Sequence, residues 1–415
     1  MSIKKEAKHL VSFLEKWTEL DVMYYVRGGA ILFSTQFLLI VSSFLLSVGF
    51  AHLTSKEFFG QFQFVLAVIG TISVLALPGA NTAVLLGVSQ KKEGTLAQAI
   101  RLKLKWCVLG VLGLLITAGY FYVKQPQYEN LWPIFLVAII FFPIMYSLDV
   151  THSFFAGRRK FQWSCAFQLV TEAGSAIGAL VSLFFTKNLL VIFLVYFVIQ
   201  AIGDISAFLF AKSKLQNNRT DPELTSYSLH LTVINFIPYI KSFFDKLIVT
   251  YFLGFAATAV FTIAAAMAEQ LYAVSKSVSM LVFPKLTAQK KEVIYSGVLK
   301  HVWKLILFFI LVAGVAAVLA PIIIPFFFSE QYRDSVLIAQ LLLLVAIPRA
   351  VGFVLTRVQE AQRQKKKLYS INALYAGVEM IALLALVPFY GMYGLVVAKG
   401  ISNFAYLVIS WRSLY

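Results

Sequence analysis

Hydrophobic residues occur in long runs along this chain, and short polar segments separate the runs. Most runs reach about 20 residues, the length that an α-helix needs to cross the hydrocarbon core of a bilayer. The pattern predicts twelve membrane-spanning helices, at 28–50, 58–87, 106–123, 131–156, 165–186, 189–211, 229–253, 256–283, 302–324, 335–358, 368–388 and 391–411. The second span contains Gly70, Pro78 and Gly79, which predict a bend.

The segment before the first run, residues 1–27, has the pattern of an amphipathic helix. Apolar residues recur at steps of four and three, and lysines occupy other positions. The apolar positions are Ile3, Ala7, Leu10, Leu14 and Trp17. A basic helix with a tryptophan on its apolar side favours a membrane surface. The alternative is a helix packed on cytoplasmic loops.

Composition agrees with a membrane protein. The 415 residues are 60% hydrophobic and only 13% charged, whereas soluble domains have about 25% charged residues. We therefore expect an all-α polytopic membrane protein.

The net charge of +17 is explained by topology. Of 36 Lys and Arg residues, 26 fall on the N-terminal segment, the even-numbered loops and the C-terminal end, and only 4 on the opposite loops. This bias predicts that both termini are cytoplasmic. Anionic membrane lipids, and not nucleic acid, are the expected partners of the basic segments.

The two halves of the chain carry a repeated pattern. Pro143 and Pro348 are 205 residues apart, and each is followed thirteen residues later by an alanine and then a basic segment. The repeat predicts two six-helix lobes, 28–211 and 229–415, joined by a cytoplasmic linker at 212–228. Two parallel bundles with a central cleft are typical of transporters.

One stretch, 238–254, combines a hydrophobic span with Lys241, Asp245 and Lys246. A charged group at bilayer depth costs about 2.5–3.5 kcal/mol on insertion scales, so such groups usually face a protein interior or water. Lys241 and Asp245 share one helix face and are expected to pair. Lys246 is rotated by about 100° from Asp245 around the helix and is therefore left for a ligand. The alternative is that these three residues form a structural ion pair that holds two helices together.

Basic residues outnumber acidic ones within the spans of the C-terminal half. The cations are Lys241, Lys246, Lys276, Arg349, Arg357 and Lys399, and the anions are Asp245, Glu269 and Glu379. A cationic cavity attracts phosphate or carboxylate groups. Arg27, Arg357 and Lys399 lie close enough to the membrane surface to extend toward it.

No catalytic motif is present. The sequence has no Gly-rich nucleotide loop that ends in Lys-Ser or Lys-Thr and no paired-histidine zinc spacing. Cys107 and Cys165 lack the spacing of a disulfide framework or metal site. We therefore expect a protein that is not an enzyme and holds no cofactor, apart from a coupling ion, H⁺ or Na⁺.

Several motifs resemble the Wzx-type polysaccharide flippases of the multidrug/oligosaccharidyl-lipid/polysaccharide (MOP) exporter superfamily. The resemblance extends over nearly the whole chain in length, span number and repeat. It is carried by AHLTSKEFFGQFQF at 51–64, Asp245 followed by Leu253-Gly254, Phe261 and Ala264, Phe283-Pro284-Lys285-Leu286, and Pro348 followed by Gln359-Glu360-Ala361-Gln362. The sequence departs from the family where Leu53-Thr54 replaces the usual Leu-Gly after the first span.

The resemblance implies a V-shaped pair of lobes that moves undecaprenyl-pyrophosphate-linked oligosaccharide across the bacterial cytoplasmic membrane by alternating access. It implies a role in cell-surface polysaccharide biosynthesis, such as O-antigen, with a polysaccharide polymerase and glycosyltransferases as partners. Asp245 and Glu269 are expected to orient cations or carry the coupling ion. The residues expected to bind the pyrophosphate or acidic sugars are Lys241, Lys246, Lys276, Arg349 and Arg27.

Three other functions remain as alternatives. A lipid II flippase commonly has two more spans than the twelve predicted here. A drug/cation antiporter of the same superfamily favours an acidic cavity, which the excess of lysine opposes. A non-transporting membrane scaffold does not explain ionisable groups inside the spans of both halves.

Overall fold

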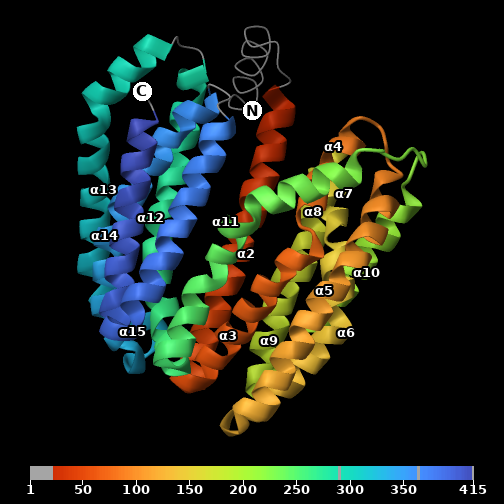
Figure 1. The fold of residues 1–415 in the computed structure, drawn as a ribbon, viewed down its shortest axis with the longest axis horizontal. Helices are drawn as coiled ribbons and strands as arrows, with labels where there is room; N and C mark the ends of the chain where they lie inside the picture. Colours follow the sequence, from red (N-terminus) through yellow and green to blue (C-terminus); the bar gives the residue numbers. More distant parts are fainter. Residues whose placement is uncertain (1–21, 288–290, 362–364, 414–415) are drawn as a thin grey trace, which may run out of the picture. The chain divides into compact units, whose positions relative to one another are not determined.

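The computed structural model describes residues 22–287, 291–361 and 365–413. All regular secondary structure in these ranges is helical (Figure 1). The prediction of an all-α polytopic membrane protein is confirmed. The amphipathic helix expected at 1–27 lies outside the described residues except for its last six, which belong to the first helix, α2 (Val22–Leu53).

The first half of the chain forms helices that follow the predicted spans. After α2 come α3 (Lys56–Ile72), η1 (Ser73–Ala76), α4 (Gly79–Ser89), α5 (Thr95–Lys124), η2 (Pro126–Tyr128), α6 (Trp132–Leu148), α7 (Val150–Gly157), α8 (Phe161–Gln168), η3 (Leu169–Ala173), α9 (Gly174–Phe185) and α10 (Leu189–Ser213). The bend expected in the second span is present, because η1 and the positive φ of Leu77 (60°) separate α3 from α4.

The second half contains fewer and longer helices. They are α11 (Leu224–Leu253), α12 (Phe255–Thr287), α13 (Lys291–Phe328), η4 (Glu330–Tyr332), α14 (Asp334–Ala361) and α15 (Lys365–Arg412). Gly391, with φ of 58°, kinks α15 and separates its two apolar parts, which match the eleventh and twelfth predicted spans. A positive φ at this kink suits glycine, which has no Cβ to clash.

Among the described residues, ten helices are long and apolar enough to cross a membrane. One of them, Lys367–Arg412, contains two predicted spans on either side of its kink. The predicted seventh span lies in α11, which is helical but carries three charged residues in its apolar part. Every predicted span therefore corresponds to helix in the described ranges.

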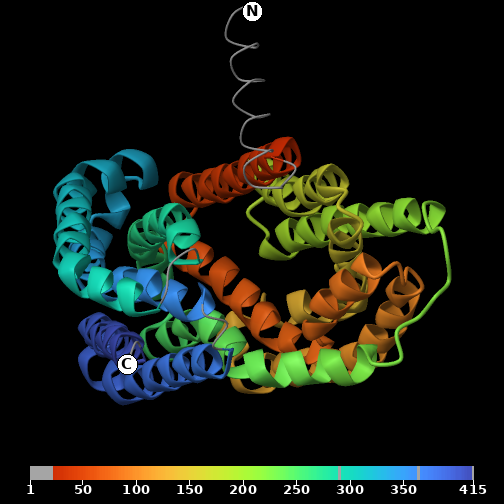
Figure 2. The same ribbon diagram turned by 90° about the horizontal axis from the view of Figure 1, so that it is seen from above.

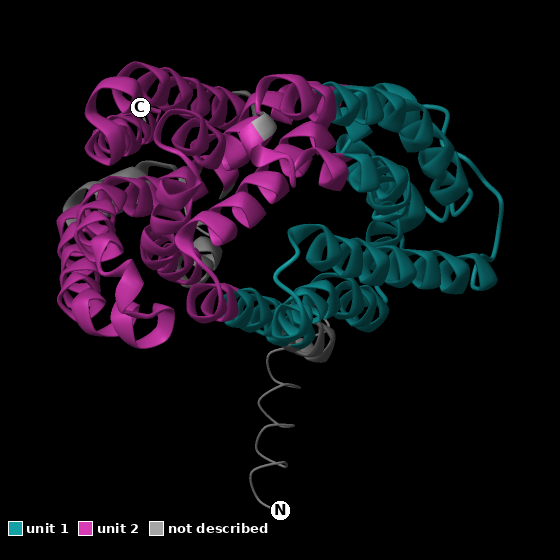
Figure 3. Cartoon of the chain, turned by 90° about the horizontal axis from the view of Figure 1, so that it is seen from below, with its two compact units in different colours: residues 1–46, 75–116, 136–229 teal, residues 47–74, 117–135, 230–415 magenta. Residues whose placement is uncertain are grey.

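Contacts divide the chain into two compact units, coloured separately in Figure 3. Unit 1 consists of residues 1–46, 75–116 and 136–229, and unit 2 of residues 47–74, 117–135 and 230–415. The division into lobes at 28–211 and 229–415 with a linker at 212–228 stays a prediction.

In unit 1, α9 and α10 pack closely along a face of small residues. A β-carbon at Gly178 would overlap the side chain of Ile199 on α10, and one at Gly203 would press on Thr171. A second apolar core joins Val84, Phe154 and Leu224 from α4, α7 and the start of α11. The small-residue face of the fifth span thus serves helix packing within the unit.

In unit 2, α14 packs against α12, α13 and α15 (Figures 1 and 2). The shared core includes Leu271, Phe309, Leu343 and Val351, all buried. α12 also packs against α3, and a β-carbon at Gly60 of α3 would overlap the carbonyl group of Phe255. Unit 2 thus contains the charged residues of α11, α12, α14 and α15.

Candidate functional site

Lys241 and Asp245 of α11 do not pair with each other. The Lys241 ammonium lies 2.9 Å from the carboxylate of Glu379, and Asp245 accepts a hydrogen bond from Lys399. Both partners belong to α15. The predicted pair within the helix is wrong, because α15 presents opposite charges to the same face of α11 and each residue is satisfied between helices.

Lys399 is the centre of this buried network. Its ammonium donates hydrogen bonds to both Asp245 and Glu379. The side chain of Glu379 is 0% exposed, and it also forms an ion pair with Lys241. The expectation that Lys399 extends toward the membrane surface is therefore wrong, since two carboxylates hold its ammonium inside the unit.

Sequence reasoning did not assign Glu379 and Lys399 to the site, although a signal was available. The two residues lie in consecutive spans on either side of the kink at Gly391, 12 residues before it and 8 after it. With a rise of about 1.5 Å per residue, both positions are predicted to lie well inside the bilayer and within reach of each other. Opposite charges at such positions of a helical hairpin favour an ion pair.

Tyr375 connects the network to α14. Lys241 donates to the Tyr375 hydroxyl at 3.2 Å, and its ammonium lies 4.4 Å from the centre of that ring. The hydroxyl donates to the Oδ1 atom of Asn403 at 3.1 Å. The amide nitrogen of Asn403 then donates to the carbonyl oxygen of Val345 at 2.8 Å. This chain of hydrogen bonds fixes α11 and α15 against α14.

Arg349 of α14 forms a second ion pair, with Glu269 of α12 at 3.1 Å. Its guanidinium also lies 4.3 Å from the centre of the Tyr272 ring, a distance at which a cation is attracted to the ring face. Lys276 is exposed and lies 4.9 Å from the centre of the same ring. Tyr272 thus contacts two cations, of which Arg349 alone has a carboxylate partner among the described residues.

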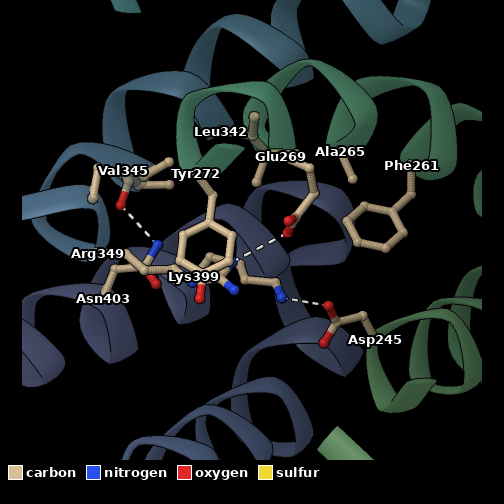
Figure 4. Close-up of a pocket in the computed structure, with 13 residues that line it drawn as sticks. Asp245, Phe261, Ala265, Glu269, Tyr272, Leu342, Val345, Arg349, Lys399 and Asn403 are labelled. Carbon is tan, nitrogen blue, oxygen red and sulfur yellow. Dashed lines mark hydrogen bonds and ion pairs between the residues drawn. The ribbon is translucent and has the colours of Figure 1, made fainter. Parts of the chain in front are cut away.

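A pocket in unit 2 joins the two ion-paired groups (Figure 4). Its cavity volume is about 60 Å³, room for a few water-sized groups. Apolar side chains such as Phe261 and Leu342 form part of its wall. Its polar lining consists of Asp245, Glu269, Tyr272, Arg349, Lys399 and Asn403.

Lys246 lies apart from this pocket lining. Its ammonium donates to the side-chain carbonyl of Gln63 on α3 at 2.7 Å. Within the described ranges, no carboxylate lies at ion-pairing distance from Lys246. Lys246 therefore has no carboxylate partner at ion-pairing distance among the described residues, and its role in ligand binding stays a prediction.

The remaining candidate, Arg27, lies in α2, and its side chain is outside the described part of the structure. The structure thus brings Asp245, Glu269 and Arg349 to one pocket, with Lys241 connected to it through Glu379. It places Lys246 and Lys276 elsewhere.

A separate polar cluster lies in unit 1. The Lys103 side chain is only 1% exposed, and its ammonium lies 2.6 Å from Asp149. Asn81 accepts from Lys103 at 2.8 Å and donates to Asp149 at 3.0 Å. Lys103, Asp149 and Asn81 bond to one another, as buried charged groups must be paired to offset their loss of hydration. No group of three or more His, Cys, Asp or Glu residues in the described ranges is arranged to hold a metal ion.

Comparison with known proteins places these features in context. The family model described as "Polysaccharide biosynthesis protein" matches residues 25–289. No curated protein sequence matches the chain.

Solved structures of MOP transporters share the fold. The lipid II flippase MurJ in an inward closed conformation superposes with a TM-score of 0.73 at 16% identity, covering 92% of this chain and 87% of that one. An inward-facing multidrug resistance MATE transporter gives 0.65 at 13% identity, with 91% and 93% covered. A MOP transporter from Pyrococcus furiosus, noted for reverse polarity of its binding pocket, gives 0.58 at 13% identity, with 95% and 94% covered. These identities show the fold alone.

Proposed function

Because the chain belongs to the polysaccharide biosynthesis protein family and has the fold of the MOP transporters, we propose that it is a lipid-linked oligosaccharide flippase. Its substrate is an undecaprenyl-pyrophosphate-linked oligosaccharide, which it moves by alternating access from the cytoplasmic to the outer leaflet. The product serves cell-surface polysaccharide synthesis such as that of O-antigen. The protein resides in the bacterial cytoplasmic membrane with both termini in the cytoplasm.

The observation that carries the proposal is the unbalanced charge of Lys246. This ammonium lies on α11, the predicted seventh span, and donates to a neutral amide, Gln63. A cation in such a place is costly unless something anionic neutralises it at some stage. The pyrophosphate group of the substrate supplies that charge, and Lys276, exposed and without a carboxylate partner among the described residues, is the second candidate to contact it.

Asp245 and Glu269 are proposed to orient cations, in keeping with their bonds to Lys399 and Arg349. Lys241 and Arg349 contribute to substrate binding as members of paired networks, not as free cations. H⁺ and Na⁺ remain the candidate coupling ions. A polysaccharide polymerase and glycosyltransferases remain the proposed partners.

Lipid II transport is the second candidate function, and the fold shared with MurJ favours it. Both substrates present a polyprenyl pyrophosphate, so the two functions differ in the head group that the pyrophosphate carries. A drug/cation antiporter is disfavoured by the unbalanced lysine, because a cationic drug gains nothing from Lys246.

The test measures flipping in proteoliposomes that contain the purified protein and a fluorescent polyprenyl-pyrophosphate disaccharide. Initial rates are compared with and without gradients of H⁺ and Na⁺. In Lys246→Gln we expect the rate to fall about tenfold or more, because a charge-assisted hydrogen bond to phosphate is worth about 1.5–3 kcal/mol. Lys124→Gln, at the exposed end of α5, is the matched control.

Three results decide between the candidates. Transport of lipid II but not of the polyprenyl-pyrophosphate disaccharide would assign the protein to the lipid II flippases. Uptake of ethidium with no movement of either lipid would point to the antiporter. Unchanged flipping in Lys246→Gln would remove Lys246 from the substrate site.

A further inference from the structure

The pocket of unit 2 is electrically balanced. Its network contains three cations, Lys241, Arg349 and Lys399, and three carboxylates, and each cation lies within ion-pairing distance of at least one carboxylate. Four of these six groups line the pocket itself, two of each sign. The surplus of positive charge that the sequence predicts for this half is therefore not among the residues that line the pocket.

The most accessible charge at the pocket is negative. The Glu269 side chain is 58% exposed, whereas that of Arg349 is 23% exposed. Lys399 is half-surrounded by the two carboxylates that hold it. An ionised phosphate or carboxylate entering the pocket would meet an exposed like charge and cations that are already paired, which is unfavourable.

The other lining groups suit a ligand that both donates and accepts hydrogen bonds. An ionised carboxylate such as Glu269 only accepts, and the guanidinium of Arg349 only donates. Tyr272 and Phe261 add aromatic surface to the same wall (Figure 4). A hydroxyl group is both donor and acceptor, and a sugar ring carries several hydroxyl groups together with an apolar face of C–H bonds.

We infer that this pocket receives hydroxyl groups of the uncharged sugar part of the substrate and discriminates against acidic sugars, while the pyrophosphate is held elsewhere. The inference rests on the proposed flippase function for the identity of the ligand as a glycan. It assigns Glu269 as the residue that sets this preference. Arg349 and Lys399 then act as hydrogen-bond donors to hydroxyl oxygens.

The test measures binding directly, by saturation-transfer NMR on the protein in nanodiscs. The two probes are cellobiose, which is neutral, and cellobiouronic acid, in which one CH₂OH group is replaced by a carboxylate. For the unmodified protein we expect cellobiose to bind about tenfold more tightly than the acid, a ratio that corresponds to about 1.4 kcal/mol. An equal or reversed preference, or no transfer to cellobiose, would overturn the inference.

Charge variants test the assignment of Glu269. Glu269→Gln leaves the pocket with one net positive charge, so the preference should shift toward the acid by about tenfold. Glu330→Gln on η4 removes a carboxylate that pairs with Arg333, outside the pocket, and should leave the ratio unchanged. If both variants shift the ratio equally, Glu269 does not set the preference.

The double variant Glu269→Gln/Arg349→Gln guards against a folding defect caused by an unpaired arginine. It restores neutrality, so cellobiose should again be preferred, and a preference that stays with the acid would contradict the charge argument. The flipping assay described above separates the two proposals. Loss of flipping with sugar selectivity intact would refute only the flippase function, and flipping without sugar selectivity would refute only this inference.

Discussion

Removing the ammonium of Lys399 tests how strongly the buried network holds unit 2 together. Lys399→Met keeps the length and apolar stem of the side chain but removes the donor to Asp245 and Glu379. Two carboxylates then share one remaining cation, Lys241, and Glu379 has no exposure to solvent. Breaking a buried ion pair by removing one partner costs about 3–5 kcal/mol, because the other charge is left uncompensated.

Protonation sets a ceiling on this loss. A carboxyl group with an ordinary pKa of about 3.9 can be neutralised at pH 7 for about 4 kcal/mol, at 1.36 kcal/mol per pH unit. At pH 5 the same step costs about 1.5 kcal/mol. Because the folded variant would then bind more protons than the unfolded chain, its stability relative to the unmodified protein should improve as the pH falls from 7 to 5.

The assay is reversible unfolding of the purified protein in mixed micelles by increasing SDS, followed by circular dichroism at pH 7 and pH 5. We expect Lys399→Met to lose about 3–4 kcal/mol at pH 7 and less at pH 5. Lys124→Met, at the exposed end of α5, should change stability by no more than about 0.5 kcal/mol. A loss below about 1 kcal/mol at pH 7, or a larger loss at pH 5, would refute the reasoning.

One further substitution in each unit tests a close contact in unit 2 and a buried ion pair in unit 1. Gly60→Ala places a β-carbon on the carbonyl oxygen of Phe255, which is backbone and cannot rotate away, so the melting temperature should fall, whereas Gly119→Ala, with open space around it, should leave it unchanged or higher. In unit 1, Lys103→Met leaves Asp149 without its cation. The Asp149 side chain is 31% exposed, whereas that of Lys103 is 1% exposed, so water can reach the carboxylate that remains. The free energy of unfolding should therefore fall by about 1–3 kcal/mol. A melting temperature unaffected by Gly60→Ala, or an SDS unfolding curve unaffected by Lys103→Met, would contradict these expectations.

Most of the fold could be predicted from hydropathy. A spanning segment in lipid must satisfy its own backbone hydrogen bonds, so a long apolar run has few options other than a helix. Even α11, with three charged residues in its apolar part, forms one continuous helix from Leu224 to Leu253. The break at Leu77 comes directly before Pro78, and the kink at Gly391 comes three residues after Pro388, as local backbone chemistry dictates.

The pairing of charges could not be predicted in the same way. Spacing along α11 identifies Lys241 and Asp245 as neighbours, but it gives no information about which helix packs against them. The structure shows that α15 supplies both partners, and that packing depends on contacts far apart in sequence. The charge count of the half therefore overestimated the cationic character of the pocket, because Asp245 and Glu379 neutralise the buried lysines Lys241 and Lys399.

The same network explains why one lysine of α11 differs from the other. A buried ion network contributes little net stability relative to an apolar core, because desolvation offsets the attraction. Its stronger effect is on geometry, since Lys241 and Asp245 meet α15 only at one rotation of α11 about its axis. At that rotation Lys246, about 100° further around the helix, is directed to Gln63 on α3 and away from the carboxylates. We therefore interpret the paired charges as the element that keeps Lys246 available for an anionic group, which makes its unbalanced charge a consequence of the packing and not an accident of composition.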